Sequence, residues 1–279
     1  MRLCSFRVHD GRERFGVADG LGVIDLTDRV CYSNLASAIT AGDLAGLAKA
    51  ATGCAVDYTT DDIVFLPTIP SPGKVVCIGL NYEPHRVEMG KDKDPYPTVF
   101  VRLNDTLVGH RGDLIKPCVS DAFDYEGEVA LVIGKAGRNI ARVDAMDHVA
   151  GYTCFMDASV RDFQVQNLIA GKNFPGSGGM GPWLVPAGDM PAPHHIRLET
   201  RLNGRVMQEG RLDELTHSIP EILTYISAWT DLRPGDIVST GTPSGVGTAR
   251  TPPVYMAAGD VIEVEVAGIG VLQNPVVTA

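Results

Sequence analysis

Two glutamates at the start of an apolar run are the first residues whose types and spacing could do chemistry. In 124-DYEGEVALVIG-134, Glu126 and Glu128 stand two positions apart. Alternate side chains of a strand share a face, so the two carboxylates would lie on one face, roughly 7 Å apart along the chain. Like charges at the mouth of a buried strand repel, and a divalent cation such as Mg²⁺ would compensate them. A solvated strand edge, or pairing with Arg or Lys, explains the same pattern.

A third carboxylate, Asp157, directly follows another apolar segment that is predicted to be a strand. A side chain at a strand end can be reached by a ligand, so Asp157 is a candidate third metal ligand. The alternative is that it caps the helix expected over residues 159–171, because aspartate is common at that position. We expect Ser159 to be the N-cap of that helix, and Arg161 and Asp162 to form structural ion pairs.

A histidine, a glutamate and a lysine add candidate acid–base and cationic groups. His85 and Glu88 lie three positions apart, and on a helical turn the glutamate would orient the imidazole and raise its basicity. An ordinary surface pair is the alternative. Lys172 stands in the glycine-rich segment 171–185, where its ammonium could hold a carboxylate or an enolate. A flexible surface loop is equally compatible with that composition.

Short strands and glycine- or proline-rich turns must position these side chains. The 31 glycines and 18 prolines suit a β-rich fold with many turns, and the strand–helix alternation of a doubly wound parallel sheet is absent. We expect the longest helix besides 159–171 at residues 219–230. The predicted strands are 75–80, 98–102, 128–134, 149–156, 197–204, 236–240 and 261–268.

A proline-rich stretch divides the chain into two predicted domains. Residues 2–26 are predicted to be short strands, and residues 34–51 a helix with Asn34 as its N-cap. The stretch 66-LPTIPSPGK-74 then has the composition of a linker. We therefore expect a small N-terminal α+β domain over residues 1–70 and the main domain over residues 71–279.

The composition narrows the classes of partner. The 279-residue chain carries a formal net charge of −10, which argues against nucleic acid and anionic membrane as partners. It has no run of 18 apolar residues and begins without the apolar core of a secretory signal, so we expect a cytoplasmic protein. The six cysteines are widely spaced, which predicts reduced, mostly packed thiols.

The motifs taken together resemble the fumarylacetoacetate hydrolase family over roughly residues 71 to 276. Five motifs occur in the family's order: GLNYxxHxxEMG, DYExE, GYTxxxDxSxRDxQ, GK…GPWLV and TGTPxGVG. The resemblance implies a β-rich α+β fold, a mixed β-sandwich roll, that is usually a homodimer. It also implies a bound divalent cation, Mg²⁺ or Mn²⁺, with Ca²⁺ as a third candidate.

The resemblance also implies roles for individual residues. Three carboxylates would bind the cation: Glu126, Glu128 and Asp157. Three residues would be catalytic, two of them as a water-activating pair on a lid and the third as a stabiliser of the enolate: His85, Glu88 and Lys172. Three residues are expected to contact a small oxo-acid substrate: Gln164, Thr242 and Tyr82. Asp124 shares the strand face of the two glutamates but lies a step further out, so we do not expect it to bind the ion.

The chain departs from the commoner family pattern at positions that bear on the substrate. Met156 replaces a frequent Asn, Pro175 replaces a frequent Asp, and residues 102–104 read Arg-Leu-Asn where a Lys-Pro-Ser type of sequence is usual. These changes leave the expected metal ligands untouched and fall in segments expected to line the pocket. They therefore concern the identity of the substrate.

Three hypotheses follow for the function. The first is metal-dependent hydrolysis of a C–C bond in a 2,4-dioxo acid such as an acylpyruvate, with water activated by His85 and Glu88. The second is a decarboxylase, tautomerase or isomerase acting at the same metal site on oxaloacetate or a 2-hydroxymuconate derivative, and it predicts activity that survives His85→Ala. The third is a catalytically silent protein that binds a metal and an oxo acid.

Overall fold

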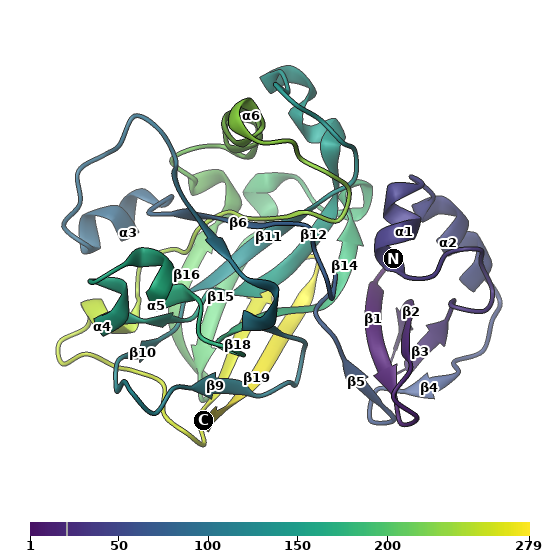
Figure 1. Ribbon diagram of the computed structural model, residues 1–279, viewed down its shortest axis with the longest axis horizontal. Coiled ribbons are helices and arrows are strands. Elements are labelled where there is room, and N and C mark those ends of the chain that lie inside the picture. The colour runs from purple at the N-terminus through teal and green to yellow at the C-terminus, as the bar shows by residue number, and fades with distance from the viewer. Residues whose placement is uncertain (21) are drawn as a thin grey trace.

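The computed structural model describes residues 1–20 and 22–279 and has a small N-terminal part beside a larger body (Figure 1). The elements of the N-terminal part are β1 (Leu3–Val8), β2 (Glu13–Asp19), β3 (Gly22–Asp25), α1 (Leu35–Thr40), α2 (Leu44–Ala51), β4 (Tyr58–Thr59) and β5 (Ile63–Phe65). The strand β1 pairs with β14 of the body, with Leu3 opposite Leu184, so the N-terminal strands extend the large sheet. The division near residue 71 stays a prediction.

The helix predicted over residues 34–51 is two helices. Asn34 is the N-cap of α1, as predicted, and its Oδ1 accepts a hydrogen bond from the backbone N–H of Ser37 at 2.8 Å. Gly42 has φ of 70°, a left-handed conformation that ends the helix. Asp43 then caps α2 by accepting a hydrogen bond from Gly46 N–H.

Among the described residues, the larger body holds two main sheets, the two-stranded pair of β10 with β13, and four α-helices. Its strands are β6 (Val75–Gly79), β7 (Thr98–Arg102), β8 (Leu107–Val108), β9 (Leu114–Lys116), β10 (Phe123–Asp124), β11 (Gly127–Ile133), β12 (Val149–Met156), β13 (Ser159–Val160), β14 (Gly178–Pro186), β15 (Arg197–Leu202), β16 (Arg205–Arg211), β17 (Ile237–Ser239), β18 (Val261–Val266) and β19 (Gly270–Thr278). Its helices are α3 (Glu83–Glu88), α4 (Arg161–Gln164), α5 (Leu168–Lys172) and α6 (Ile219–Trp229).

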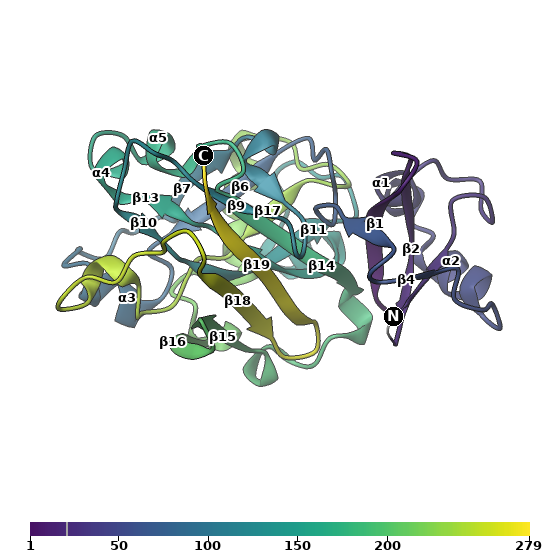
Figure 2. The same ribbon diagram turned by 90° about the horizontal axis from the view of Figure 1, so that it is seen from below.

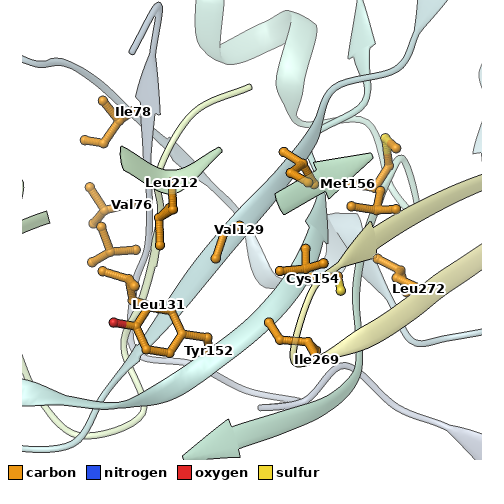
Figure 3. Close-up of a cluster of buried hydrophobic side chains, with 14 of the residues drawn as sticks. Val76, Ile78, Val129, Leu131, Tyr152, Cys154, Met156, Leu212, Ile269 and Leu272 are labelled. Atoms are coloured by element: carbon orange, nitrogen blue, oxygen red, sulfur yellow. The ribbon is translucent and has the colours of Figure 1, made fainter. Parts of the chain in front are cut away.

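The two sheets pack face to face, as the predicted mixed β-sandwich requires. The large sheet runs β4-β3-β2-β1-β14-β12-β11-β17-β6-β7, and the smaller one runs β16-β15-β18-β19-β9. Both are mixed, because β17 and β6 are parallel in the first, and β19 and β9 in the second. Figure 2 shows β18 and β19 lying across the strands β11 and β14. Buried side chains such as Val129, Cys154 and Leu272 fill the space between the layers (Figure 3).

Two predicted segments have a different structure. The helix expected over residues 159–171 is two short helices, and Ser159 does not cap either, because it belongs to β13 and its Oγ donates to the backbone O of Asp157. The glycine-rich segment after Lys172 is largely strand β14. A Cβ at Gly179 of this strand would lie 2.7 Å from Asn274 Oδ1, so the glycine permits close packing of the sheets.

A histidine between the N-terminal strands and the last strand should make the fold sensitive to acid. Nδ1 of His110 accepts a hydrogen bond from the backbone N–H of Gln273 at 3.1 Å, and the ring lies edge-on to Phe65. Burial, with a smaller contribution from Arg111, lowers the pKa of His110 from 6.5 to about 4. The folded state therefore keeps His110 neutral at pH values where the unfolded chain binds a proton.

We expect the free energy of unfolding to fall as the pH decreases from 6.5 to 4, with His110 contributing at most about 3 kcal/mol. In His110→Asn this contribution should disappear, because the amide oxygen accepts the same hydrogen bond without titrating. Chemical denaturation of both proteins across this pH range measures the difference. If the free energies of unfolding of the wild type and of His110→Asn fall in parallel as the pH decreases, His110 does not cause the loss of stability.

Two further observations concern membrane-spanning helices and the cysteines. No helix among the described residues is long and apolar enough to cross a membrane. The cysteines of the described structure are free thiols; Cys4, Cys77 and Cys154 are buried, as predicted for most of them, whereas Cys54 is half-buried and Cys31 and Cys118 are exposed.

Candidate functional site

The antiparallel pair β11–β12 brings the three predicted metal ligands together. In this pair Gly127 lies opposite Met156, and just beyond it the backbone N–H of Asp157 donates to the backbone O of Glu126 at 2.8 Å. Asp157 therefore lies across from Glu126, just beyond the paired residues, and Glu128 lies two residues further along the chain, in β11. Glu126, Glu128 and Asp157 are all buried, and each offers an oxygen within 4.8 Å of the others.

Gly127 allows this arrangement because the strand passes close to the second sheet. A Cβ at this position would lie 2.0 Å from Oγ1 of Thr200. The backbone N–H of Gly127 donates to Gln208 Oε1 at 3.0 Å, and its C=O accepts from Thr242 Oγ1 at 2.9 Å. The segment between the two glutamates is thus held on both sides.

Each carboxylate of the triad has an outer partner that fixes one of its oxygens. Arg161 Nη2 lies 2.7 Å from Glu126 Oε1. Arg102 Nη1 donates to Asp157 Oδ1 at 2.7 Å. For Glu128, the partners of Oε2 are the hydroxyl of Ser239 and the backbone N–H of Gly241. Partners of this kind orient carboxylates that bind metal ions.

Lys172 lies between two of the carboxylates on the inner side. It is the last residue of α5 and is 1% exposed. Its Nζ donates to Glu126 Oε2 at 2.6 Å and to Asp157 Oδ2 at 2.5 Å, and it lies 5.1 Å from the centre of the Phe100 ring. Burial acts to lower the pKa of Lys172, but Asp157 and Glu126 outweigh it and raise the pKa, so the side chain is an ammonium ion.

The two glutamates have opposite electrostatic environments. Burial raises the pKa of Glu128, and the nearby charges of Asp157 and Glu126 raise it further. Burial also acts to raise the pKa of Glu126, but Lys172 and Arg161 outweigh it and lower the pKa. Glu128 is therefore the carboxylate that most lacks positive charge.

The predicted histidine–glutamate pair forms on α3 and is tied to a neighbouring loop. Nδ1 of His85 lies 3.0 Å from Oε2 of Glu88, and Oε1 of Glu88 accepts a hydrogen bond from the backbone N–H of Gly245 at 2.9 Å. Pro84 lies in the first turn of the helix, where its missing N–H costs nothing. The imidazole is held in a defined orientation, as a general base requires.

One cavity of about 560 Å³ is bordered by two carboxylates of the triad, Lys172 and His85, while Asp157 and Glu88 lie behind its wall, against Lys172 and His85. Its buried wall includes Glu126, Glu128, Lys172 and His85, and Phe100 contributes an apolar surface. This volume suits a small organic molecule. Charged groups that converge in such a cavity, with raised and lowered pKa values side by side, are typical of an active site.

The three expected substrate contacts have different positions. Gln164 lines the cavity, and its Oε1 accepts a hydrogen bond from Arg161 Nη1 at 2.7 Å. Thr242 also lines it, but its hydroxyl already donates to Gly127 and accepts from Gln208 Nε2 at 2.8 Å. Tyr82 is 1% exposed and is not part of the cavity wall, because its ring is packed in the core.

Two arginines contact the triad in a way that the sequence did not predict. Arg161 was expected to form a structural ion pair near Asp162, yet it lines the cavity and contacts Asp124 and Glu126 instead. Asp162 accepts a hydrogen bond from Ser120 Oγ. Arg102, at the end of β7, is buried against Asp157. The sequence does contain an indication of this contact. Arg102 is a charged residue at the end of an apolar strand, and a charged side chain that is buried there needs a partner of opposite charge.

Asp124 is occupied by other donors. Its carboxylate accepts hydrogen bonds from Arg161 Nε at 2.8 Å and from the backbone N–H groups of Gly247 and Thr248 at 2.7 and 2.9 Å. These contacts leave it as a support for Arg161.

The donor set of the triad fits a hard divalent cation. It consists of carboxylate oxygens only, without a thiolate or an imidazole, which is the chemistry preferred by Mg²⁺, Mn²⁺ and Ca²⁺. A bound ion would share Glu126 and Asp157 with the ammonium of Lys172, which already lies within 2.6 Å of both.

Comparison with known proteins defines the class. The model of the family described as Fumarylacetoacetate (FAA) hydrolase C-terminal matches residues 74–277, and the chain belongs to the fumarylacetoacetate hydrolase family. The protein is therefore an enzyme of this superfamily that acts on a small molecule.

Particular members of the family are similar over most of their length. Oxaloacetate tautomerase YisK of Bacillus subtilis (strain 168) is 40% identical over 226 residues, covering 78% of this chain and 75% of that protein. The structure of fumarylacetoacetate hydrolase (EaFAH) from Exiguobacterium antarcticum is 33% identical with a TM-score of 0.84, and that of maleylpyruvate hydrolase from Sphingobium sp. SYK-6, in complex with manganese (II) ion and pyruvate, is 27% identical with a TM-score of 0.83. Each of these two comparisons covers 100% of both chains.

Proposed function

We propose that the protein is a divalent-cation-dependent tautomerase that interconverts the enol and keto forms of a small 2-oxo acid, with oxaloacetate as the substrate to test first. The observation that carries this proposal is one cavity lined by two carboxylates of the triad and by a buried ammonium that contacts the third, in a chain 40% identical to an oxaloacetate tautomerase. The charges of the cavity wall support the proposal. Lys172 and Arg161 both line the cavity, and their positive charges suit an enolate better than a neutral intermediate.

The residues of the site would have different roles in this reaction. A divalent cation held by Glu126, Glu128 and Asp157 would polarise the 2-oxo group and stabilise negative charge on its oxygen. Lys172 presents a fixed ammonium to the same charge, since its contacts with Glu126 and Asp157 hold it in place. In the forward direction the enol oxygen loses a proton and C3 gains one. No water adds to the carbon skeleton.

Hydrolysis of a C–C bond is the second candidate, and one observation favours it. His85 lines the cavity with Nδ1 3.0 Å from Glu88, which is the arrangement of a base that activates water. Hydrolysis consumes that water, whereas tautomerisation does not. The two reactions therefore differ in their need for His85.

We expect His85→Ala to lower the rate of enol–keto conversion by no more than about tenfold, which is less than the loss of a general base usually costs. Hydrolysis of an acylpyruvate, where the wild type shows any, should fall at least about 100-fold in the same variant. Loss of enol absorbance on enol-oxaloacetate measures the first reaction, and analysis of the cleavage products measures the second. Pyruvate formation is followed separately, so that decarboxylation is distinguished.

His194→Ala is the matched control, because His194 lies in the short 3₁₀ turn Pro193–His195 and not in the cavity wall. It should leave both rates unchanged. A wild-type protein that, with Mg²⁺ or Mn²⁺, does not accelerate enol–keto conversion would refute the proposal. A loss of 100-fold or more of tautomerase activity in His85→Ala would assign the proton transfer to His85.

A further inference from the structure

One charged residue of the cavity wall differs from the others in its exposure. Among the described residues that line the cavity, the ionisable ones at its deep end are buried: His85, Glu126, Glu128, Arg161 and Lys172. Lys91 also lines the cavity but is exposed. It lies with Met89, Val165 and Leu168, which are exposed or half-buried and mark the mouth.

We propose that Lys91 binds the second carboxylate of a dicarboxylic substrate and so selects diacids over 2-oxo monoacids. The inference rests on the proposed function for the identity of the reacting end. The oxo-acid end belongs at the deep triad, because the groups that stabilise enolate charge are there. A substrate that extends from the triad to the mouth places its far end beside Lys91.

The position of Lys91 is fixed by the backbone that carries it. Gly90 has φ of 61°, which turns the chain at the end of α3. The backbone N–H of Lys91 then donates to Arg86 O at 3.1 Å, and the guanidinium of Arg86 donates to the backbone O of Lys91. The helix itself is tied to the opposite loop through Glu88 and Gly245. Only the side chain of Lys91 is left to adjust to a ligand.

The ammonium of Lys91 has no ion pair with any residue that the structure describes. Its neighbours Asp92 and Asp94 are exposed and do not line the cavity, and Asp94 Oδ2 accepts a weak hydrogen bond from Thr98 Oγ1 at 3.4 Å. By contrast, Arg161 and Lys172 are already paired with carboxylates. Lys91 is thus the cation of the wall that a ligand can engage without displacing a partner.

The balance of buried charge gives a second reason for a cation at the mouth. Four buried carboxylates face three buried cationic side chains: Asp124, Glu126, Glu128 and Asp157 against Arg102, Arg161 and Lys172. With all of them ionised, a divalent ion changes an excess of one negative charge into an excess of one positive charge. This excess complements one carboxylate of a ligand. A second carboxylate requires a further positive charge, which Lys91 supplies.

The test compares two ligands of equal chain length that differ at one end. Oxaloacetate carries a carboxylate where 2-oxobutanoate carries a methyl group. Calorimetric titration of each into the protein with saturating Mg²⁺ gives dissociation constants independently of turnover. We expect the wild type to bind the diacid about tenfold more tightly, the effect of one charge-assisted hydrogen bond. Lys91→Met should remove this preference and leave 2-oxobutanoate binding unchanged.

Two further variants complete the experiment. Lys93→Met is the matched control, since Lys93 is an exposed lysine of the same loop that is not in the cavity wall, and it should keep the preference. Lys91→Arg should restore it. The inference is overturned when the wild type shows no preference, or when Lys91→Met keeps it or weakens both ligands equally. Diacid preference that depends on Lys91, in a protein without enol–keto activity, would refute the proposed function alone.

Discussion

Replacing Lys172 by methionine should destabilise the metal-free protein by about 3–5 kcal/mol, and a divalent cation should restore most of that loss. The buried ammonium contacts Glu126 at 2.6 Å and Asp157 at 2.5 Å. Without it, these carboxylates keep Arg161 and Arg102 as partners, but the side that faces the cavity has no positive charge. The buried cluster then holds four carboxylates against two arginines, so it must carry the excess negative charge or take up a proton, and both cost free energy.

The cation response separates this effect from a general loss of packing. Methionine has nearly the length of the lysine stem, so it fills the space beside the Phe100 ring, over which the ammonium lies in the wild type. Mg²⁺ or Mn²⁺ no longer shares the carboxylates with an ammonium, and its stabilising effect should be larger in Lys172→Met than in the wild type. A packing defect would lower the stability equally with and without the ion.

Denaturant titrations with chelator and with saturating Mg²⁺ measure these differences. Lys116→Met is the control, because Lys116 is largely covered but pairs with the fully exposed carboxylate of Asp121. Its loss should stay within about 1 kcal/mol and should not respond to the ion. A Lys172→Met protein whose stability equals the wild type, or is lowered equally with and without Mg²⁺, would show that Lys172 does not compensate the triad.

Strand periodicity was sufficient to bring two of the carboxylates together, because side chains two positions apart in a strand must share a face. In the structure Glu128 lies in β11 and Glu126 immediately precedes it, and their carboxylate oxygens come within 4.8 Å of each other. The position of Asp157 at a strand end was also readable, but its distance from the glutamates was not. That distance depends on the pairing of β11 with β12, which places Asp157 beside Glu126.

Contacts between distant segments account for what periodicity could not predict. Lys172 was expected in a loop, whereas it closes a short helix whose packing directs the ammonium into the triad. Arg102 approaches Asp157 from β7, 55 positions away in the chain. Arg161 was assigned to local ion pairs, because neighbours in sequence are the only partners that spacing can suggest. Such contacts are set by tertiary packing and leave no periodic signal.

Glu128→Gln should have the opposite effect on stability, because it removes a charge that the metal-free site does not compensate. Burial and the charges of Asp157 and Glu126 raise the pKa of Glu128. A glutamine has the same shape, and its oxygen can accept the hydrogen bonds from Ser239 and Gly241 that the carboxylate accepts. The metal-free variant should therefore be as stable as the wild type or more stable.

The same substitution should abolish the response to the cation and the activity. A carboxylate ligand replaced by a neutral amide lowers the affinity for a hard divalent ion, and the site then loses its main stabiliser of enolate charge. We expect enol–keto conversion to fall by about a thousandfold or more, the equivalent of several kcal/mol of transition-state stabilisation. Thermal unfolding with and without Mg²⁺, together with the enol assay, gives both quantities for one protein.

Glu209→Gln is the matched control, since Glu209 is an exposed residue of β16 outside the cavity wall. It should change neither the cation response nor the rate. If Mg²⁺ still stabilises the Glu128→Gln variant, Glu128 is not a metal ligand, even when the variant has lost its activity. A variant that loses stability in chelator would mean that the metal-free site already balances the charge of Glu128. Because Lys172→Met and Glu128→Gln change the charge of one cluster in opposite directions, their opposite effects on metal-free stability would identify electrostatics, and not packing, as the cause.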